Sequence, residues 1–147
     1  MEFQIQRAEI SDLAALAALG ARLWPHHTEA ELEADFAEAM AGGAAYFLAL
    51  AGGVPAGFAQ CQLRRDYVEG TDSSPVGYLE GIFVAEEYRG RGGARQLLAA
   101  CETWARDQGC TEFASDCELD NAQSIRFHLG VGFREANRIV CFAKKLS

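Results

Sequence analysis

Residues 78–100 place an apolar strand, a basic glycine-rich loop and a helix in direct succession, and this order constrains the fold more than any other stretch. Residues 78–84 are apolar, aromatic-rich and of strand length. The loop 89–94 reads Arg-Gly-Arg-Gly-Gly-Ala, and strong helix formers occupy 96–100. Glycines let main-chain N–H groups approach a ligand, and the first N–H groups of a helix lack internal acceptors. The stretch therefore predicts a site for a phosphate-bearing ligand.

Two common phosphate-binding motifs are absent from this loop. The dinucleotide fingerprint G-x-G-x-x-G fails, because Gly90 and Gly92 are followed by Arg95 where the third glycine should stand. The nucleoside-triphosphate loop needs Gly-Lys followed by Ser or Thr, which the chain does not contain. What remains is Arg-x-x-Gly-x-Ala, at Arg89, Gly92 and Ala94. The alternative is an ordinary glycine-rich turn between a strand and a helix.

Length and composition predict one soluble globular domain spanning 1–147. The chain is 50% hydrophobic and has a mean hydropathy of −0.06, as ordinary globular proteins do. No apolar run approaches the roughly 18 residues of a membrane span, and no secretory signal precedes the first strand, so we expect a cytoplasmic protein. Five cysteines form no C-x-x-C pair, so we expect neither a metal site nor a disulfide framework. The net charge of −8 disfavours nucleic acid as a partner and is compatible with a cationic small molecule.

The order of predicted elements indicates an α/β fold. A helix capped by Ser11 should follow the first strand and end near Pro25, and Thr28 should begin a second helix through a capping box. The pair Gly52-Gly53 predicts a hairpin turn. The resulting order is β-α-α-β-β-β-α-β-α-β-β, with one mixed central sheet and helices on both faces. The expected strands are 3–7, 45–51, 54–63, 78–84, 111–115, 133–136 and 139–144.

This element order, with the Arg-x-x-Gly-x-Ala loop after the fourth strand, resembles the GCN5-related N-acetyltransferase (GNAT) superfamily over nearly the whole chain. Five further stretches resemble aminoglycoside 6'-N-acetyltransferases, namely Leu-Trp-Pro-His-His at 23–27, Asp-Tyr-Val-Glu-Gly at 66–70, Asp-Ser-Ser-Pro-Val at 72–76, Leu-Glu-Gly-Ile-Phe-Val at 79–84 and Ala-Ser-Asp at 114–116. The resemblance implies a GNAT-like fold and acetyl transfer from acetyl-CoA to the 6' amine of aminoglycoside antibiotics. It also implies direct attack in a ternary complex, antibiotic resistance, and a homodimer that pairs or exchanges residues 139–144.

The resemblance, read with acetyl-transfer chemistry, makes two carboxylates the candidate catalytic residues. A polycationic substrate needs carboxylates to hold its ammonium groups and to accept one proton. Glu80 is the leading amine ligand and general base, and its alternative is a charge at the sheet edge pointing to solvent. Asp116 is expected across the same cleft, and its alternative is an N-terminal cap of the following helix.

The other site residues follow from the resemblance. The predicted substrate-binding residues are Trp24, His27, Tyr67, Asp72, Glu80 and Asp116. The predicted cofactor-binding residues are Ile82, Phe83, Val84, Arg89, Gly90, Arg91, Gly92, Gly93, Ala94 and Asn121. Gly81, beside Glu80, is consistent with a β-bulge there, and Asn121 could equally be a helix cap.

One position departs from the superfamily, and other functions stay open. Many members carry a tyrosine acid where this chain has His128. A histidine can donate the same proton because its pKa lies near neutrality, but we expect His128 to be structural. The alternatives are acetylation of another small amine or a protein terminus, and a non-catalytic acyl-CoA sensor.

Overall fold

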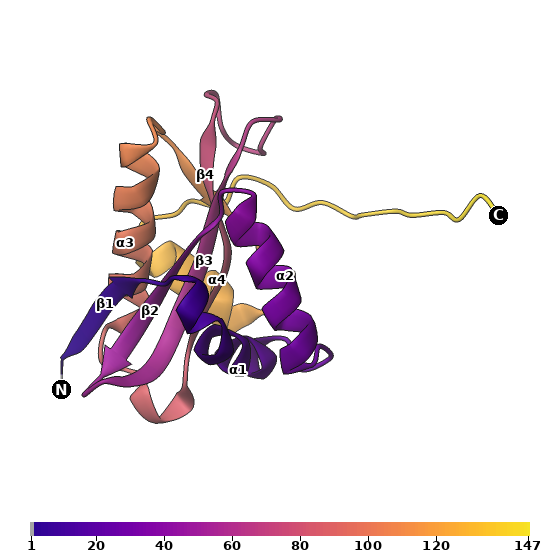
Figure 1. The fold of residues 1–147 in the computed structure, drawn as a ribbon. Coiled ribbons are helices and arrows are strands. Elements are labelled where there is room, and N and C mark those ends of the chain that lie inside the picture. Colours follow the sequence, from indigo (N-terminus) through magenta and orange to yellow (C-terminus); the bar gives the residue numbers. More distant parts are fainter. Residues whose placement is uncertain (1) are drawn as a thin grey trace.

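The computed structural model describes residues 2–147, in which a five-stranded sheet of order β1-β2-β3-β4-β5 forms the centre (Figure 1). The first four strands are antiparallel and β5 runs parallel to β4, so the sheet is mixed. The strands are β1 (Phe3–Arg7), β2 (Ala45–Ala51), β3 (Val54–Arg64), β4 (Val76–Val84) and β5 (Phe113–Ser115). The helices are α1 (Leu13–Leu23), α2 (Glu29–Ala41), α3 (Gly93–Asp107) and α4 (Ala122–Gly130), with short 3-10 turns at η1 (Ile10–Asp12) and η2 (Glu86–Tyr88).

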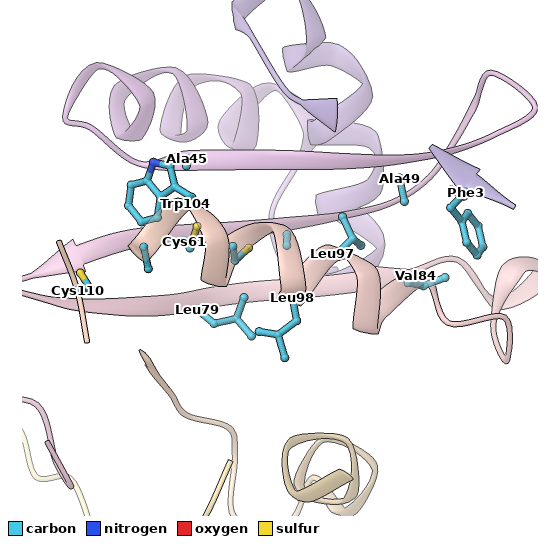
Figure 2. Close-up of a cluster of buried hydrophobic side chains, with 14 of the residues drawn as sticks. Phe3, Ala45, Ala49, Cys61, Leu79, Val84, Leu97, Leu98, Trp104 and Cys110 are labelled. Atoms are coloured by element: carbon cyan, nitrogen blue, oxygen red, sulfur yellow. The ribbon is translucent and has the colours of Figure 1, made fainter. Parts of the chain in front are cut away.

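Helices cover both faces of the sheet, as the sequence predicts. On one face α3 packs Leu97, Leu98 and Trp104 against the strands, as Figure 2 shows, and Phe127 of α4 packs against the same cluster. On the other face, α1 and α2 bury Leu16 and Phe36 with aromatic side chains of the sheet. The apolar spacing in each helix explains this burial, because residues three and four apart share one face. No helix within 2–147 is both long and apolar enough to cross a membrane.

The hairpin between β2 and β3 confirms the turn that the sequence predicts. Gly52 and Gly53 have φ angles of 57° and 84°, which side chains other than glycine adopt at a cost. Two consecutive positive φ angles give a turn whose twist matches that of the flanking strands. The pairing then aligns Ala51 with Val54.

One helix start is confirmed and one is wrong. Thr28 Oγ1 accepts a hydrogen bond from Glu31 N at 3.1 Å, and Glu31 Oε1 accepts one from Thr28 N, which completes the predicted capping box. Ser11 does not cap α1, because it lies within the 3-10 turn η1. Asp12 instead stabilises the start of this turn, accepting a hydrogen bond from Glu9 N at 2.8 Å.

A β-bulge in β4 coincides with Glu80. Gln60 pairs with Gly81 and Cys61 pairs with Leu79, so β4 has one residue more than β3 over this step. The additional residue is Glu80. A bulge re-aims the side chain at which it occurs, and Glu80 reaches Gln62 and Arg64 of the neighbouring strand.

The two closing strands predicted at 133–136 and 139–144 are wrong for this chain on its own. Residues 133–147 contain no assigned strand, and the C-terminal segment runs away from the body as an extended tail (Figure 1). The apolar run at 139–143 is of strand length, but a strand needs a neighbour to satisfy its N–H and C=O groups. The tail therefore exposes apolar side chains, among them Phe142, which is 91% exposed.

Candidate active site

The parallel pair β4–β5 ends early and leaves half of β4 open on one side. The pairing runs only from Gly77 with Phe113 to Leu79 with Ser115. On its other side, β4 stays paired with β3 as far as Val84. Residues 80–84 therefore present main-chain groups to a gap where the two parallel strands separate. An extended ligand can add to such an edge through main-chain hydrogen bonds.

The glycine loop lies directly beyond the open end of β4. Gly90 and Gly92 have φ angles of 79° and 82°, so both use the freedom that glycine provides. Gly92 is the N-cap residue of α3, and its carbonyl accepts a hydrogen bond from Gln96 N at 3.0 Å. The first N–H groups of α3 therefore face the loop side, where the helix dipole favours an anion. The exposed Arg91 lies in this loop.

A cavity of about 440 Å³ joins this loop to α4. Its lining includes Arg89, Arg95 and Arg126, which supply positive charge. Arg89 is held in place, because its Nε donates to Val84 O at 2.8 Å and its guanidinium lies 5.7 Å from the Phe83 ring centroid. Glycines, a helix N-terminus and several arginines fit a pyrophosphate-bearing ligand.

Sequence reasoning missed three polar residues of this cavity, namely Arg95, Gln123 and Arg126. Arg95 lies in the first turn of α3, just beyond the loop, and its Nη2 donates to Gly130 O at 3.3 Å. Gln123 and Arg126 come from α4, which is separated from the loop by the whole of α3 and β5. The only sequence signal was a cationic residue on a helix that follows β5, and only the packing of α4 shows that it faces the loop.

Asn121 is the N-cap of α4. Its Oδ1 accepts a hydrogen bond from Ser124 N at 3.1 Å. The side-chain amide nitrogen is the donor that this cap does not use, so the capping role and the predicted contact to pantetheine are compatible.

At the other end of the open stretch 80–84, Glu80 is held by two side chains of β3. Gln62 Nε2 donates to Glu80 Oε2 at 2.6 Å. Arg64 donates through Nε to Oε2 at 3.2 Å and through Nη2 to both carboxylate oxygens at 3.0 Å. The Glu80 side chain is 20% exposed. It is therefore a partly buried, paired carboxylate, which argues against a charge pointing freely to solvent.

Asp116 follows β5 and accepts a hydrogen bond from the hydroxyl of Tyr78 in β4. Burial, and then the bond to Asp116, raise the pKa of the Tyr78 hydroxyl, so it stays protonated and donates. Since Asn121 caps α4, Asp116 does not have the capping role that was its alternative. Tyr78 pairs with Gln62 of β3, so their side chains share one face of the sheet. Gln62 bonds Glu80, and Tyr78 therefore holds Asp116 on the face that carries Glu80.

Trp24, just after α1, lies on β4 next to Glu80. A Cβ placed on Gly81 would come within 2.7 Å of Trp24 Cη2, so the indole rests directly on the main chain of this glycine. The ring also packs edge-on against Phe36 and Phe58, at centroid separations of 6.2 and 6.1 Å. Trp24 thus forms a fixed wall beside the bulge.

The other three predicted substrate residues lie on surrounding loops. His27 Nδ1 is 3.7 Å from Glu31 Oε2 between α1 and α2. Tyr67 is 76% exposed and its hydroxyl donates to Glu69 Oε2 at 3.0 Å. The loop at Asp72 is anchored through its main chain, because Asp72 N donates to Glu112 Oε1 at 2.9 Å. The structure thus brings Trp24, Glu80 and Asp116 to one face of β4, while the substrate roles of all six residues stay predictions.

His128 is bonded on both ring nitrogens. Its Nδ1 lies 2.7 Å from Ser124 O and its Nε2 lies 2.9 Å from Ser115 Oγ. A carbonyl oxygen only accepts, so Nδ1 carries a proton. This arrangement fixes α4 against the end of β5 and agrees with a structural role.

The open edge of β4 is followed by a glycine loop that leads into α3, and two carboxylates lie beyond the edge. Residues 8–133 match the Acetyltransferase (GNAT) family. The chain belongs to this family.

Its relatives include several enzymes of one activity. Aminoglycoside N(6')-acetyltransferase type 1 of Stenotrophomonas maltophilia is 43% identical over 142 residues, which cover 97% of this chain and 93% of the relative. The enzyme of the same name from Salmonella typhimurium strain LT2 is 45% identical over 125 residues, covering 84% and 86%. The solved structure of AAC(6')-Iy with the bisubstrate analogue CoA-S-monomethyl-acetylneamine has a TM-score of 0.93 at 40% identity, covering 99% of both chains.

Proposed function

We propose that this protein transfers the acetyl group of acetyl-CoA to the 6' amine of aminoglycoside antibiotics and thereby confers resistance to them. The observation that carries the proposal is the likeness, over 99% of both chains, to an enzyme solved with a bisubstrate analogue in which coenzyme A is joined to neamine. The site agrees with such a ligand, because a basic glycine-rich loop and a pair of carboxylates lie at opposite ends of the same open strand edge.

The cofactor half of the proposal rests on the open edge of β4 and the loop behind it. Acetyl-CoA supplies an activated thioester when bound. Main-chain groups of Ile82 and Val84, next to Phe83, hold the pantetheine arm, and residues 89–94 hold the pyrophosphate. Asn121 donates its amide to the same arm. A main-chain N–H of β4 is also suited to stabilise the acetyl oxygen as negative charge develops on it.

The substrate half rests on Glu80 and Asp116, which hold the ammonium groups of a polycation. Trp24 and Tyr67 provide flat faces for the sugar rings, and His27 and Asp72 line the entrance. Direct attack needs an unprotonated amine aligned with the thioester, so Glu80 accepts one proton, directly or through water.

The proposal includes a homodimer and a cytoplasmic location. The C-terminal tail exposes Ile139, Val140 and Phe142 by 68%, 77% and 91%, and apolar side chains in an extended segment favour pairing with another chain. The base of the tail lies against the loop that carries Tyr67, since Asn137 Nδ2 donates to Glu69 Oε1 at 3.1 Å. β5 has only three residues and leaves an edge that the tail of a second copy can extend.

Thiol release tests the activity. The purified full chain is mixed with acetyl-CoA and a panel of aminoglycosides that carry an amine at the 6' position, with matched drugs that carry a 6' hydroxyl as controls. We expect coenzyme A release with the amines and none with the hydroxyl compounds. Turnover of polyamines in place of every drug would overturn the proposal, and so would the absence of any thiol release.

Light scattering during gel filtration tests the dimer. We expect the full chain to elute at twice its own mass, and the variant Phe142→Asp to shift toward the monomer, because a charge in a buried apolar interface is costly. The matched control is Lys144→Asp, which changes charge on the same tail without adding it to an apolar position. A full chain that stays monomeric at about 100 µM, well above the dissociation constants of stable interfaces, would contradict the dimer whatever the drug assay gives.

A further inference from the structure

Arg64 is the cation that contacts Glu80 of the predicted carboxylate pair and the Tyr78 ring that bonds the other member, Asp116. Its guanidinium bonds both oxygens of Glu80, with Nη2 at 3.0 Å from each. Its Cζ also lies 3.5 Å from the centroid of the Tyr78 ring, a close cation–π stack. Tyr78 in turn donates its hydroxyl to Asp116. One side chain therefore connects Glu80 directly, and Asp116 through Tyr78, into a single unit.

Two carboxylates beside one substrate site need such a cation. Glu80 is only 20% exposed, and a partly buried carboxylate without a partner carries a large desolvation penalty. Like charges at one site also repel each other, which would spread the two side chains apart when no substrate is bound. Arg64, 40% exposed at the end of β3, offsets both effects and keeps its planar fork against Glu80.

The hydrogen bonds to Glu80 are unevenly divided between its two oxygens. Oε2 accepts from Gln62 Nε2, from Arg64 Nε and from Arg64 Nη2. Oε1 accepts a bond from Arg64 Nη2 only, among the residues that the structure describes. A carboxylate oxygen has about two lone-pair positions. Oε2 is therefore saturated by the protein, whereas Oε1 retains capacity to accept from an incoming amine.

We propose that Arg64, assisted by Gln62, is a positioning residue that anchors Glu80 through Oε2 and directs Oε1 toward the substrate amine. Arg64 stays paired with Glu80 when substrate binds and touches neither the drug nor acetyl-CoA. Through Tyr78 it also holds Asp116 in place for a second ammonium group. This inference rests on the proposed function, since it assigns a role in holding that substrate.

The variants Arg64→Met and Arg64→Lys test the assignment, with Arg65→Met as the matched control. Met keeps much of the length of the side chain without its charge, and Lys keeps the charge without the planar fork. Arg65 follows Arg64 directly, is exposed, and loses the same charge when replaced. Steady-state kinetics with a drug that carries a 6' amine, with acetyl-CoA as the second substrate, and thermal unfolding are measured for each.

Arg64→Met should raise the KM for the drug by roughly 10- to 100-fold, the loss expected when a charged hydrogen-bonded partner is removed. The KM for acetyl-CoA should stay within about twofold, because Arg64 lies outside the cofactor cavity. Arg64→Lys should recover part of the loss, and Arg65→Met should behave as wild type. In the Glu80→Gln background, Arg64→Met should have a much smaller effect, because the charged group that it positions is gone.

An alternative is that Arg64 occupies the amine position and is expelled by the drug. Arg64→Met would then lower the KM for the drug, and that result would overturn the assignment. An unchanged KM in an active enzyme, or equal losses for the drug and acetyl-CoA, would overturn it as well while leaving the proposed function intact. Wild-type enzyme that turns over no drug would overturn the proposed function itself, and the assignment with it.

Discussion

The two ends of the open β4 edge are built in different ways. The cofactor end is a continuous stretch in which strand, glycine loop and helix follow one another, from Val76–Val84 to Gly93–Asp107. The carboxylate end collects Trp24 after α1, Arg64 from β3, Glu80 from β4 and Asp116 after β5. A contiguous site depends on local main-chain geometry, whereas an assembled site depends on strand register and on side-chain packing over long sequence separations. Substitutions at the carboxylate end should therefore weaken drug binding, and substitutions at the cofactor end should weaken acetyl-CoA binding.

The largest expected difference between the effects on the drug and on acetyl-CoA comes from Glu80→Gln. The substitution keeps the shape of the side chain and removes the charge that an ammonium group and a departing proton require, so kcat/KM for the drug should fall about 10²- to 10³-fold. The KM for acetyl-CoA should change by less than about twofold. Steady-state kinetics with each substrate varied in turn measures both. A comparable loss for acetyl-CoA would mean that the two ends are not separable.

Gly81→Ala should also weaken drug binding alone, by displacing the Trp24 indole. The new Cβ would come within 2.7 Å of Trp24 Cη2, so the indole must shift although the φ angle of Gly81 is ordinary. We expect the KM for the drug to rise roughly tenfold and the KM for acetyl-CoA to hold, since a displacement of about 1 Å is costly in a positioned site. Gly42→Ala is the control, because its Cβ would meet only atoms at 3.5 Å or beyond. Equal kinetics for the two variants would refute this role of Trp24.

Gly92→Ala should weaken acetyl-CoA binding and leave drug binding nearly unchanged. Its φ of 82° costs an alanine about 1–2 kcal/mol, and that strain falls on the N-cap of α3 beside the predicted pyrophosphate position. The affinity for acetyl-CoA should fall several-fold, measured by calorimetry, with little change in the KM for the drug. Gly109→Ala carries a similar strain at φ 91°, at the far end of α3, and should lower the melting temperature without affecting acetyl-CoA. If both variants weaken acetyl-CoA binding equally, the loss arises from lower global stability and not from a change in the loop.

The smallest effect is expected at Glu112, which anchors the loop beneath the carboxylate end. Hydrogen bonds from Ser73 and from the main chain of Asp72 lower the pKa of Glu112 below its ordinary value of 4.5. A lowered pKa in the folded state contributes stability above pH 4.5 that is lost as the pH falls through the folded-state value. Glu112→Gln should therefore lower the melting temperature at neutral pH by roughly 1–3 °C, and the gap should close as the pH falls below 4.5 through the folded-state pKa. Scanning calorimetry across this pH range would refute the anchor if the gap stayed constant.

Much of the fold could be predicted, because its signals are local. The Gly52-Gly53 turn, the Thr28 capping box and the Gly90–Gly92 loop each depend on the conformations of a few adjacent residues. Ser11 was the local exception, since a 3-10 turn moved the start of the helix. The open edge of β4 was not visible in the same way, because it depends on where β5 stops pairing.

The sequence by itself determined the strand–loop–helix stretch and the order of elements up to α4. The resemblance supplied the candidate residues at both ends, whose roles stay predictions. Only the tertiary structure decided that Glu80 is the additional residue of a bulge, that Asp116 bonds Tyr78 instead of capping α4, and that Arg64 joins the two. It also decided that the tail of one chain finds no strand to join. The physical reason is the same in each case. Local hydrogen bonds and apolar spacing depend on residues that are neighbours in the sequence. Ion pairs and strand edges depend on partners that only folding brings together.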